Sequence, residues 1–92
     1  MIESFKHKGL KKLYDKGDRS GLRTDIAKKV ELYLSILDAA STVEELDVTG
    51  FGFHPLTGNL RGFYSVVMSR NHRMIFRFEE GSAFDVDLVD YH

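Results

Sequence analysis

The chain has 92 residues, with 13 Lys or Arg, 14 Asp or Glu, 42% apolar residues and no cysteine. This length suffices for one domain, so we expect a single domain over residues 1–92 and no separate cofactor-binding domain. The absence of cysteine excludes disulfides, thiolate metal sites and a cysteine nucleophile. No apolar run approaches the roughly 20 residues of a membrane span, and the N-terminus lacks a signal-peptide core. We therefore expect a cytoplasmic protein that does not act at a membrane.

Charge is distributed unevenly along the chain. Residues 1–30 hold nine Lys or Arg and four acidic residues, whereas residues 31–60 hold five acidic residues and no Lys or Arg. Residues 61–92 hold four Arg, no Lys and five acidic residues. The basic first third can attract phosphate, although a solvated helix face explains it as well. The acidic middle third is either another solvated face or a place where a basic protein surface docks.

Helical periodicity dominates the first half. Apolar residues at helical spacing predict a helix over residues 7–16, which Gly17 ends. A second apolar stripe predicts a longer helix, with Ser20 or Thr24 capping its start. The stripe comprises Ile26, Val30, Tyr33, Leu34 and Leu37. A weaker helical turn is expected over Val43–Leu46, because acidic residues suit a first turn.

After residue 46 the pattern changes from helical to extended. Residues 47–61 hold three glycines and the only proline, and predict a loop with one short strand over Phe51–His54. Three strands then follow, over Phe63–Met68, Arg73–Phe78 and Ala83–Val89. Alternation places Met74, Phe76 and Phe78 on one face, and likewise Phe84, Val86 and Leu88 opposite Asp85 and Asp87. Helices followed by strands indicate an α+β fold, with the helices on one face of a small antiparallel sheet and the other face open.

Metal chemistry is a poor candidate, because the four histidines are not spaced as ligands, and we expect no metal and no cofactor. The strand half instead carries Arg, His and Tyr side chains. RNA cleavage without a metal requires such groups, because the 2′-OH of the substrate is the nucleophile. The enzyme supplies a base, an acid for the leaving 5′-oxygen and cations for the phosphorane. Histidine serves as base or acid near pH 7, and arginine serves as the cation.

The same residues also have structural interpretations. Arg73 and Arg77 share one strand face and can pair with Asp85 and Asp87 on the next strand. On this interpretation His54 is an ordinary loop residue, His72 faces solvent beside a turn and Tyr64 is a half-buried strand residue. The residues alone leave both interpretations open.

Motifs along nearly the whole chain resemble the HigB toxins of the RelE/ParE toxin–antitoxin superfamily. The N-terminal motif is Met1-Ile2-x-Ser4-Phe5-Lys6-His7-Lys8-Gly9-Leu10. The others are His54-Pro55-Leu56-x-Gly58, Gly62-x-Tyr64-Ser65, Asn71-x-Arg73 and the terminal Asp90-Tyr91-His92. The resemblance implies a RelE-like, microbial-ribonuclease-type fold and ribosome-dependent cleavage of mRNA in the A site. It also implies a HigA-type helix-turn-helix antitoxin, through which alone the toxin would reach operator DNA.

Carried over to this chain, the family's active-site positions fall on five residues: His54, Arg73, Asp90, Tyr91 and His92. By resemblance, Arg73 holds the scissile phosphate, His92 is the general acid or base, and His54 assists proton transfer. Asp90 and Tyr91 orient the nucleotide or the histidine. The chain departs from the family at two positive charges, where it has Thr57 and the Val66–Met68 stretch. Arg61 and Arg70, with Asn71, are the nearby residues expected to bind RNA in their place.

Two other functions stay open beside the ribosome-dependent nuclease. The first is a ParE-like inhibitor of DNA gyrase on the same fold, which would bind its target without catalysis of its own. The terminal acid/base residue His92 favours the nuclease over this inhibitor. The second is a weakened toxin that retains only antitoxin binding, which the departures at Thr57 and Val66–Met68 would support.

Overall fold

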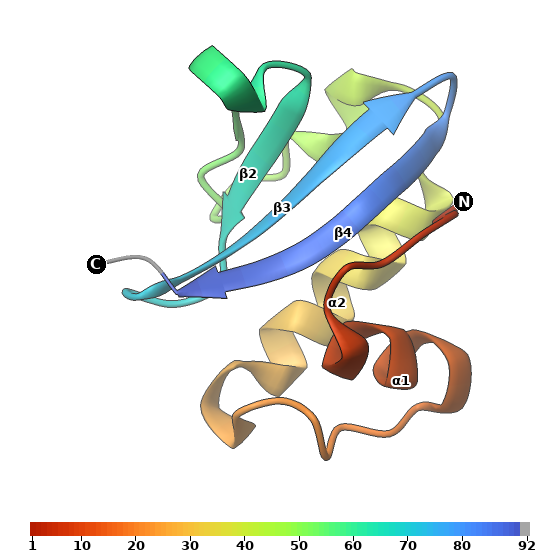
Figure 1. The fold of residues 1–92 in the computed structure, drawn as a ribbon, viewed down its shortest axis with the longest axis vertical. Helices are drawn as coiled ribbons and strands as arrows, with labels where there is room; N and C mark the ends of the chain where they lie inside the picture. The colour runs from red at the N-terminus through yellow and green to blue at the C-terminus, as the bar shows by residue number, and fades with distance from the viewer. Residues whose placement is uncertain (91–92) are drawn as a thin grey trace.

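The computed structural model of the chain describes residues 1–90, so Tyr91 and His92, two of the expected site residues, lie outside the described residues. Figure 1 shows two helices on one side of a curved sheet. The helical elements are α1 (Lys8–Lys16), α2 (Thr24–Ala39) and two short 3-10 turns, η1 (Val43–Leu46) and η2 (Gly58–Leu60). The strands are β1 (His54–Pro55), β2 (Phe63–Val67), β3 (His72–Glu79) and β4 (Ser82–Asp90).

The sheet is antiparallel throughout, in the order β1-β2-β3-β4. The expected meander of three strands is confirmed, and β1 adds a short fourth strand at its edge. This strand covers His54–Pro55 and not Phe51–His54 as expected. Pro55 suits an edge position, because a proline nitrogen cannot donate to a further strand.

The core lies between α2 and one face of the sheet. All five residues of the predicted stripe on α2 are buried, and Tyr33 contacts Phe51 and Phe76 with ring centroids 4.9 and 6.1 Å apart. From the sheet, Val66, Met74 and Phe76 are fully buried. The predicted α+β arrangement is therefore confirmed, and the opposite face of the sheet stays open to a ligand.

The ends of the two helices follow different rules. Gly17 ends α1 with a left-handed φ of 69°, as predicted. The expected serine or threonine cap of α2 is wrong, since the N-cap is Arg23 and no side chain of the described residues 1–90 caps the helix. Thr24 is already the first helical residue, and Ser20 donates its backbone N–H to Asp18 in the preceding loop.

A bulge in β4 overturns the predicted alternation of that strand. The pairing of β3 with β4 slips between Ile75 and Arg77, and Asp85 adopts a left-handed φ of 54°. As a result Phe84 lies directly opposite Arg77, whose guanidinium stands 5.0 Å from its ring centroid. Phe84 therefore does not share a face with Val86, because an inserted residue exchanges the two faces of a strand.

The N-terminal segment runs beside β4, as Figure 1 shows. Two isolated parallel bridges hold it there, between Ile2 and Ala83 and between Phe5 and Val86. The hydroxyl of Ser4 also accepts a hydrogen bond from the backbone N–H of Asp85. The segment before α1 thus helps to hold the bulged strand in place.

Candidate active site

A hollow of about 490 Å³ opens on the face of the sheet that the helices leave uncovered. All four strands contribute to it, because directly opposite residues of neighbouring strands point to the same side. One such row runs from His54 through Ser65 and Ile75 to Asp87. The described lining residues are His54, Leu56, Leu60, Ser65, Arg73, Ile75, Val89 and Asp90. Apolar walls thus surround three residues that were expected at the site: His54, Arg73 and Asp90.

A backbone carbonyl fixes the tautomer of His54. Its Nδ1 lies 3.0 Å from the carbonyl oxygen of Gly52, two residues earlier. A carbonyl only accepts hydrogen bonds, so Nδ1 must carry a proton. In the neutral imidazole Nε2 then keeps its lone pair, which is the form that a general base requires. The side chain is exposed and lines the hollow, so a substrate can reach it.

The two arginines of β3 have different surroundings. Arg77 is engaged by acidic partners, with its Nε 3.2 Å from Asp85 and its Nη1 bonded to Glu79. The expected pairing of Arg77 with an acidic residue of the next strand is thereby confirmed. Arg73 lies four residues earlier on the same face and pairs in register with Val67 and Val89. Of the two, only Arg73 is among the residues that line the hollow.

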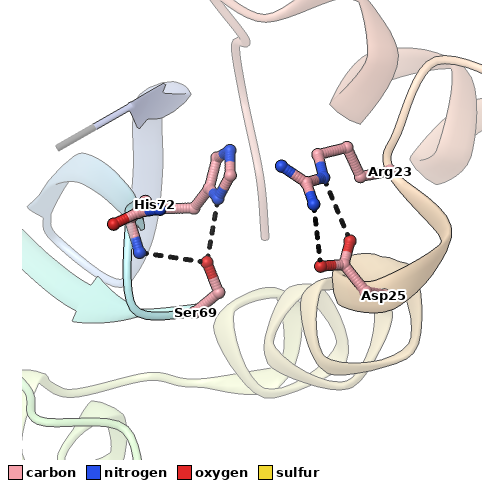
Figure 2. Close-up of polar contacts among 5 residues, drawn as sticks. Arg23, Asp25, Ser69 and His72 are labelled. Carbon is pink, nitrogen blue, oxygen red and sulfur yellow. Dashed lines mark hydrogen bonds and ion pairs between the residues drawn. The ribbon is translucent and has the colours of Figure 1, made fainter. Parts of the chain in front are cut away.

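Asp90 stands between this hollow and a second one of about 240 Å³, and it lines both. His72 faces the second hollow, half-buried, with Nδ1 2.8 Å from the hydroxyl of Ser69. Figure 2 shows this ring across from the guanidinium of Arg23, which pairs with Asp25 at 3.2 Å. The expectation that His72 faces solvent is met only in part, because the side chain is half-buried and the hydroxyl of Ser69 in the preceding turn contacts its ring.

The three expected RNA-binding residues lie outside the hollow. Arg61 follows η2, and Arg70 and Asn71 form the turn between β2 and β3. All three are exposed, and none is among the described residues that line the hollow.

Comparison with known proteins identifies the family. A model of the family described as "RelE-like toxin of type II toxin-antitoxin system HigB" matches residues 3–92. The chain belongs to this HigB-like toxin family. "Endoribonuclease HigB" of Proteus vulgaris is 38% identical over 92 residues, which span the whole of both chains. "Toxin HigB-1" of Vibrio cholerae serotype O1 is 33% identical over 90 residues, which cover 96% of this chain and 95% of that protein.

Solved structures confirm the RelE-like fold of this toxin. The crystal structure of YafQ from E. coli superposes with a TM-score of 0.66 at 13% identity, covering 98% of the toxin and 91% of that chain. A chain of the YoeB–YefM complex from Staphylococcus aureus superposes with a TM-score of 0.57 at 18% identity, covering 100% and 98%. At such low identity these matches concern the fold alone.

The basic third of the toxin is partly neutralised within the fold. Lys11 pairs with Asp15 at 2.7 Å, and Arg19 pairs with Glu31 at 2.9 Å. The guanidinium of Arg19 donates to the carboxylate of Glu31 and lowers its pKa. This pair joins the loop before α2 to the helix, so part of the acidic middle third faces the basic third. Such exposed pairs contribute little to stability, because solvent and salt screen them.

Two kinds of feature are absent from the described residues: a cluster of metal ligands and a membrane-spanning helix. Within residues 1–90, no three His, Asp or Glu side chains converge as a metal site would require. In the same range, no helix is long and apolar enough to cross a membrane.

The motifs also missed the apolar walls of the hollow. Side chains two residues apart on a strand share a face, so the alternation that places Arg73 on the open face places Ile75 there too. The sequence could therefore have predicted this one apolar wall residue.

Proposed function

We propose that this toxin is an endoribonuclease that cuts mRNA in the ribosomal A site without a metal ion. The observation that carries the proposal is the convergence of His54, Arg73 and Asp90 on one hollow of the open face. Two further facts support it: the family is one of toxins, and a relative 38% identical over the full chain is named an endoribonuclease.

The geometry favours a division of labour between the two basic groups. His54, with Nδ1 held by Gly52, presents Nε2 to remove the proton of the substrate's 2′-OH. Arg73 offers the planar fork that suits a phosphate and stabilises the charge that develops on the phosphorane. The leaving 5′-oxygen needs an acid, and the family resemblance implies His92, which lies outside the described residues. Asp90 and Tyr91 are proposed to orient these groups.

Dependence on the ribosome follows from the weak positive charge at the site. The hollow holds one arginine and one aspartate among its described residues, so it offers little general attraction for RNA. A substrate that the ribosome holds in place no longer needs to be captured and oriented by the toxin. Arg61, Arg70 and Asn71 are proposed to contact the flanking RNA from the turns.

The proposed partner in the cell is a HigA-type helix-turn-helix antitoxin, through which alone the toxin reaches operator DNA. Membership of a toxin–antitoxin family supports an antitoxin partner. Cytoplasmic action follows from the proposed substrate, because translating ribosomes are located there.

A purified translation system with defined mRNA tests the nuclease. The 5′ ends are mapped by primer extension, with and without ribosomes. We expect discrete cuts in the A site that appear with ribosomes and are absent when ribosomes are left out. Arg73→Ala should lower the rate by about 10²–10³.

Arg77→Ala is the matched control, because Arg77 lies on the same strand and face but outside the hollow. It should cut at nearly the rate of the parent toxin. If translation continues and the mRNA stays uncut, the proposal is overturned. A supercoiling assay with DNA gyrase would then test the inhibitor, and antitoxin binding alone would indicate the weakened toxin.

A further inference from the structure

The hydroxyl of Ser65 is buried and has no hydrogen-bond partner among residues 1–90. Ser65 has no exposed surface, and among the described residues its Oγ is the buried side-chain polar atom that finds no partner. An unpaired buried hydroxyl destabilises a fold, and an alanine or valine would suit a buried strand position better. A native structure that keeps such a group therefore has a use for it.

The position of this hydroxyl points to a ligand. Ser65 lies at the centre of β2, directly opposite His54 of β1 on one side and Ile75 of β3 on the other. Directly opposite side chains on antiparallel strands have Cβ atoms about 4.5–5.5 Å apart. Ser65 lines the same hollow as His54 and Arg73. The unpaired group is thus next to the proposed base.

The walls of the hollow indicate which part of the substrate comes to rest there. Leu56, Leu60, Ile75 and Val89 are apolar, and a phosphate gains nothing from such walls. A flat nucleobase does, and RNA is recognised mostly by unstacked bases that enter pockets and hydrogen-bond through their edges. Arg73 lines the same hollow, on the side where the adjoining phosphate would lie under the proposed function.

We propose that Ser65 determines specificity, its hydroxyl being the hydrogen-bond partner for the edge of a nucleobase seated among these apolar walls. The inference rests on the proposed function, whose substrate it specifies. A serine hydroxyl both donates and accepts, so the position in which the walls hold each base edge decides which base pairs with it best. Leu60, 40% exposed and two residues before Gly62 with its φ of 95°, is the wall residue whose displacement would open the hydroxyl to the base.

The experiment compares Ser65→Ala with the parent toxin in three measurements. The first is the thermal midpoint, which should not fall, because removal of an unpaired hydroxyl breaks no internal bond. The second is the distribution of cut sites over an mRNA library with all codons, at matched extent of cleavage. We expect about a tenfold loss at the preferred codons and a flatter distribution. Ser65→Cys, of similar size but a weaker donor, should lie between the two.

The third measurement does not depend on cleavage. Each of the four nucleoside 5′-monophosphates is titrated into the parent toxin and into Ser65→Ala, with backbone amide NMR shifts as the signal. The parent should prefer one base by several-fold, with shifts at Ile75 and Val89, and the variant should lose that preference. Arg73→Ala is the control, since it should weaken all four nucleotides alike.

The outcomes separate the two proposals. A parent toxin that cuts mRNA, with a Ser65→Ala variant of unchanged rate and codon distribution, overturns the role of Ser65 and leaves the nuclease standing. A lowered thermal midpoint in Ser65→Ala overturns it as well, because the hydroxyl would then have an internal partner. A parent that does not cut overturns the nuclease, and the nucleotide titration then decides alone whether Ser65 recognises a base.

Discussion

The Nδ1–H of His54 donates to the carbonyl oxygen of Gly52 at 3.0 Å, which leaves Nε2 as the proton acceptor of a side chain that lines the hollow. This relationship separates two roles of one side chain. The hydrogen bond orients the ring, and the second nitrogen performs the chemistry. A glutamine at this position can keep an N–H donor for the carbonyl but has no basic nitrogen.

We therefore expect His54→Gln to lower mRNA cleavage by about 10²–10⁴, the usual contribution of a positioned general base. The free energy of unfolding should change by less than about 0.5 kcal/mol, because the side chain is exposed. Single-turnover cleavage and urea unfolding measure the two effects. His72→Gln is the control, since His72 lines the other hollow. Undiminished cleavage by His54→Gln would assign the base to another group.

Gly52 supplies the carbonyl oxygen that accepts the hydrogen bond from His54. Its φ is +58°, and a Cβ at this position would lie 3.1 Å from Cγ2 of Val67. Gly52→Ala should therefore destabilise the toxin by about 1–2 kcal/mol and displace the carbonyl that orients His54. Cleavage per folded molecule should fall as well, measured at a temperature where both proteins are folded.

Gly50→Ala is the matched control for Gly52→Ala. Gly50 also has a left-handed φ, of +96°, but nothing lies within 4 Å of an added Cβ. It should lose a similar free energy of unfolding and keep its cleavage rate. Equal cleavage by the two variants would show that the carbonyl of Gly52 does not position the imidazole.

Periodicity predicted the elements that carry a regular pattern. The stripe from Ile26 to Leu37 is wholly buried in α2, and the faces of β3 alternate as expected. The phase of β4 was wrong because a bulge depends on backbone strain at Asp85, which Ser4 of the distant N-terminus supports. No local pattern of apolar residues contains that contact.

The candidate site likewise has residues that the sequence predicted and one that only the folded structure reveals. The motifs brought His54, Arg73 and Asp90 to attention, and the register of four strands places all three at one hollow. The sequence did not predict Ser65 as a site residue, because a serine within a strand has no distinctive pattern beyond its place in the Gly62-x-Tyr64-Ser65 motif. Its burial and the lack of a partner for Oγ are properties of the folded sheet, to which His54 and Ile75 contribute from neighbouring strands.

A close backbone contact joins α1 to the loop before α2. A Cβ on Gly9 would lie 2.5 Å from the carbonyl oxygen of Gly21, and a Cβ on Gly21 would lie 2.7 Å from Cα of Gly9. Alanine usually stabilises a helix by about 1 kcal/mol relative to glycine. Here Gly9→Ala should instead destabilise by about 1–3 kcal/mol, because backbone cannot move aside as a side chain can. Lys8→Ala on the same helix should stay within about 0.5 kcal/mol of the parent in urea unfolding. A stabilised Gly9→Ala variant would contradict the contact.

The last prediction concerns Tyr33, whose buried hydroxyl donates to the carbonyl of Leu46 at 2.9 Å and joins α2 to η1. Burial raises the pKa of this phenol, and the nearby carboxylate of Asp47 raises it further. Unfolded tyrosine ionises near pH 10, so above that pH the unfolded chain binds fewer protons than the native one. Stability must then fall as pH rises.

Tyr33→Phe removes both effects of the hydroxyl. At pH 7 it should destabilise the toxin by about 1–2 kcal/mol, because the Leu46 carbonyl loses its buried partner. Between pH 9 and about 11 the variant should lose less stability than the parent, so the gap between their unfolding free energies narrows. Urea unfolding at several pH values measures this gap. Tyr14→Phe is the comparison, because the Asp38 carboxylate raises the pKa of Tyr14 too, but that side chain is 38% exposed and its alkaline contribution should be smaller. Parallel alkaline slopes for the parent and Tyr33→Phe would mean that the phenol ionises in the native state as readily as in the unfolded one.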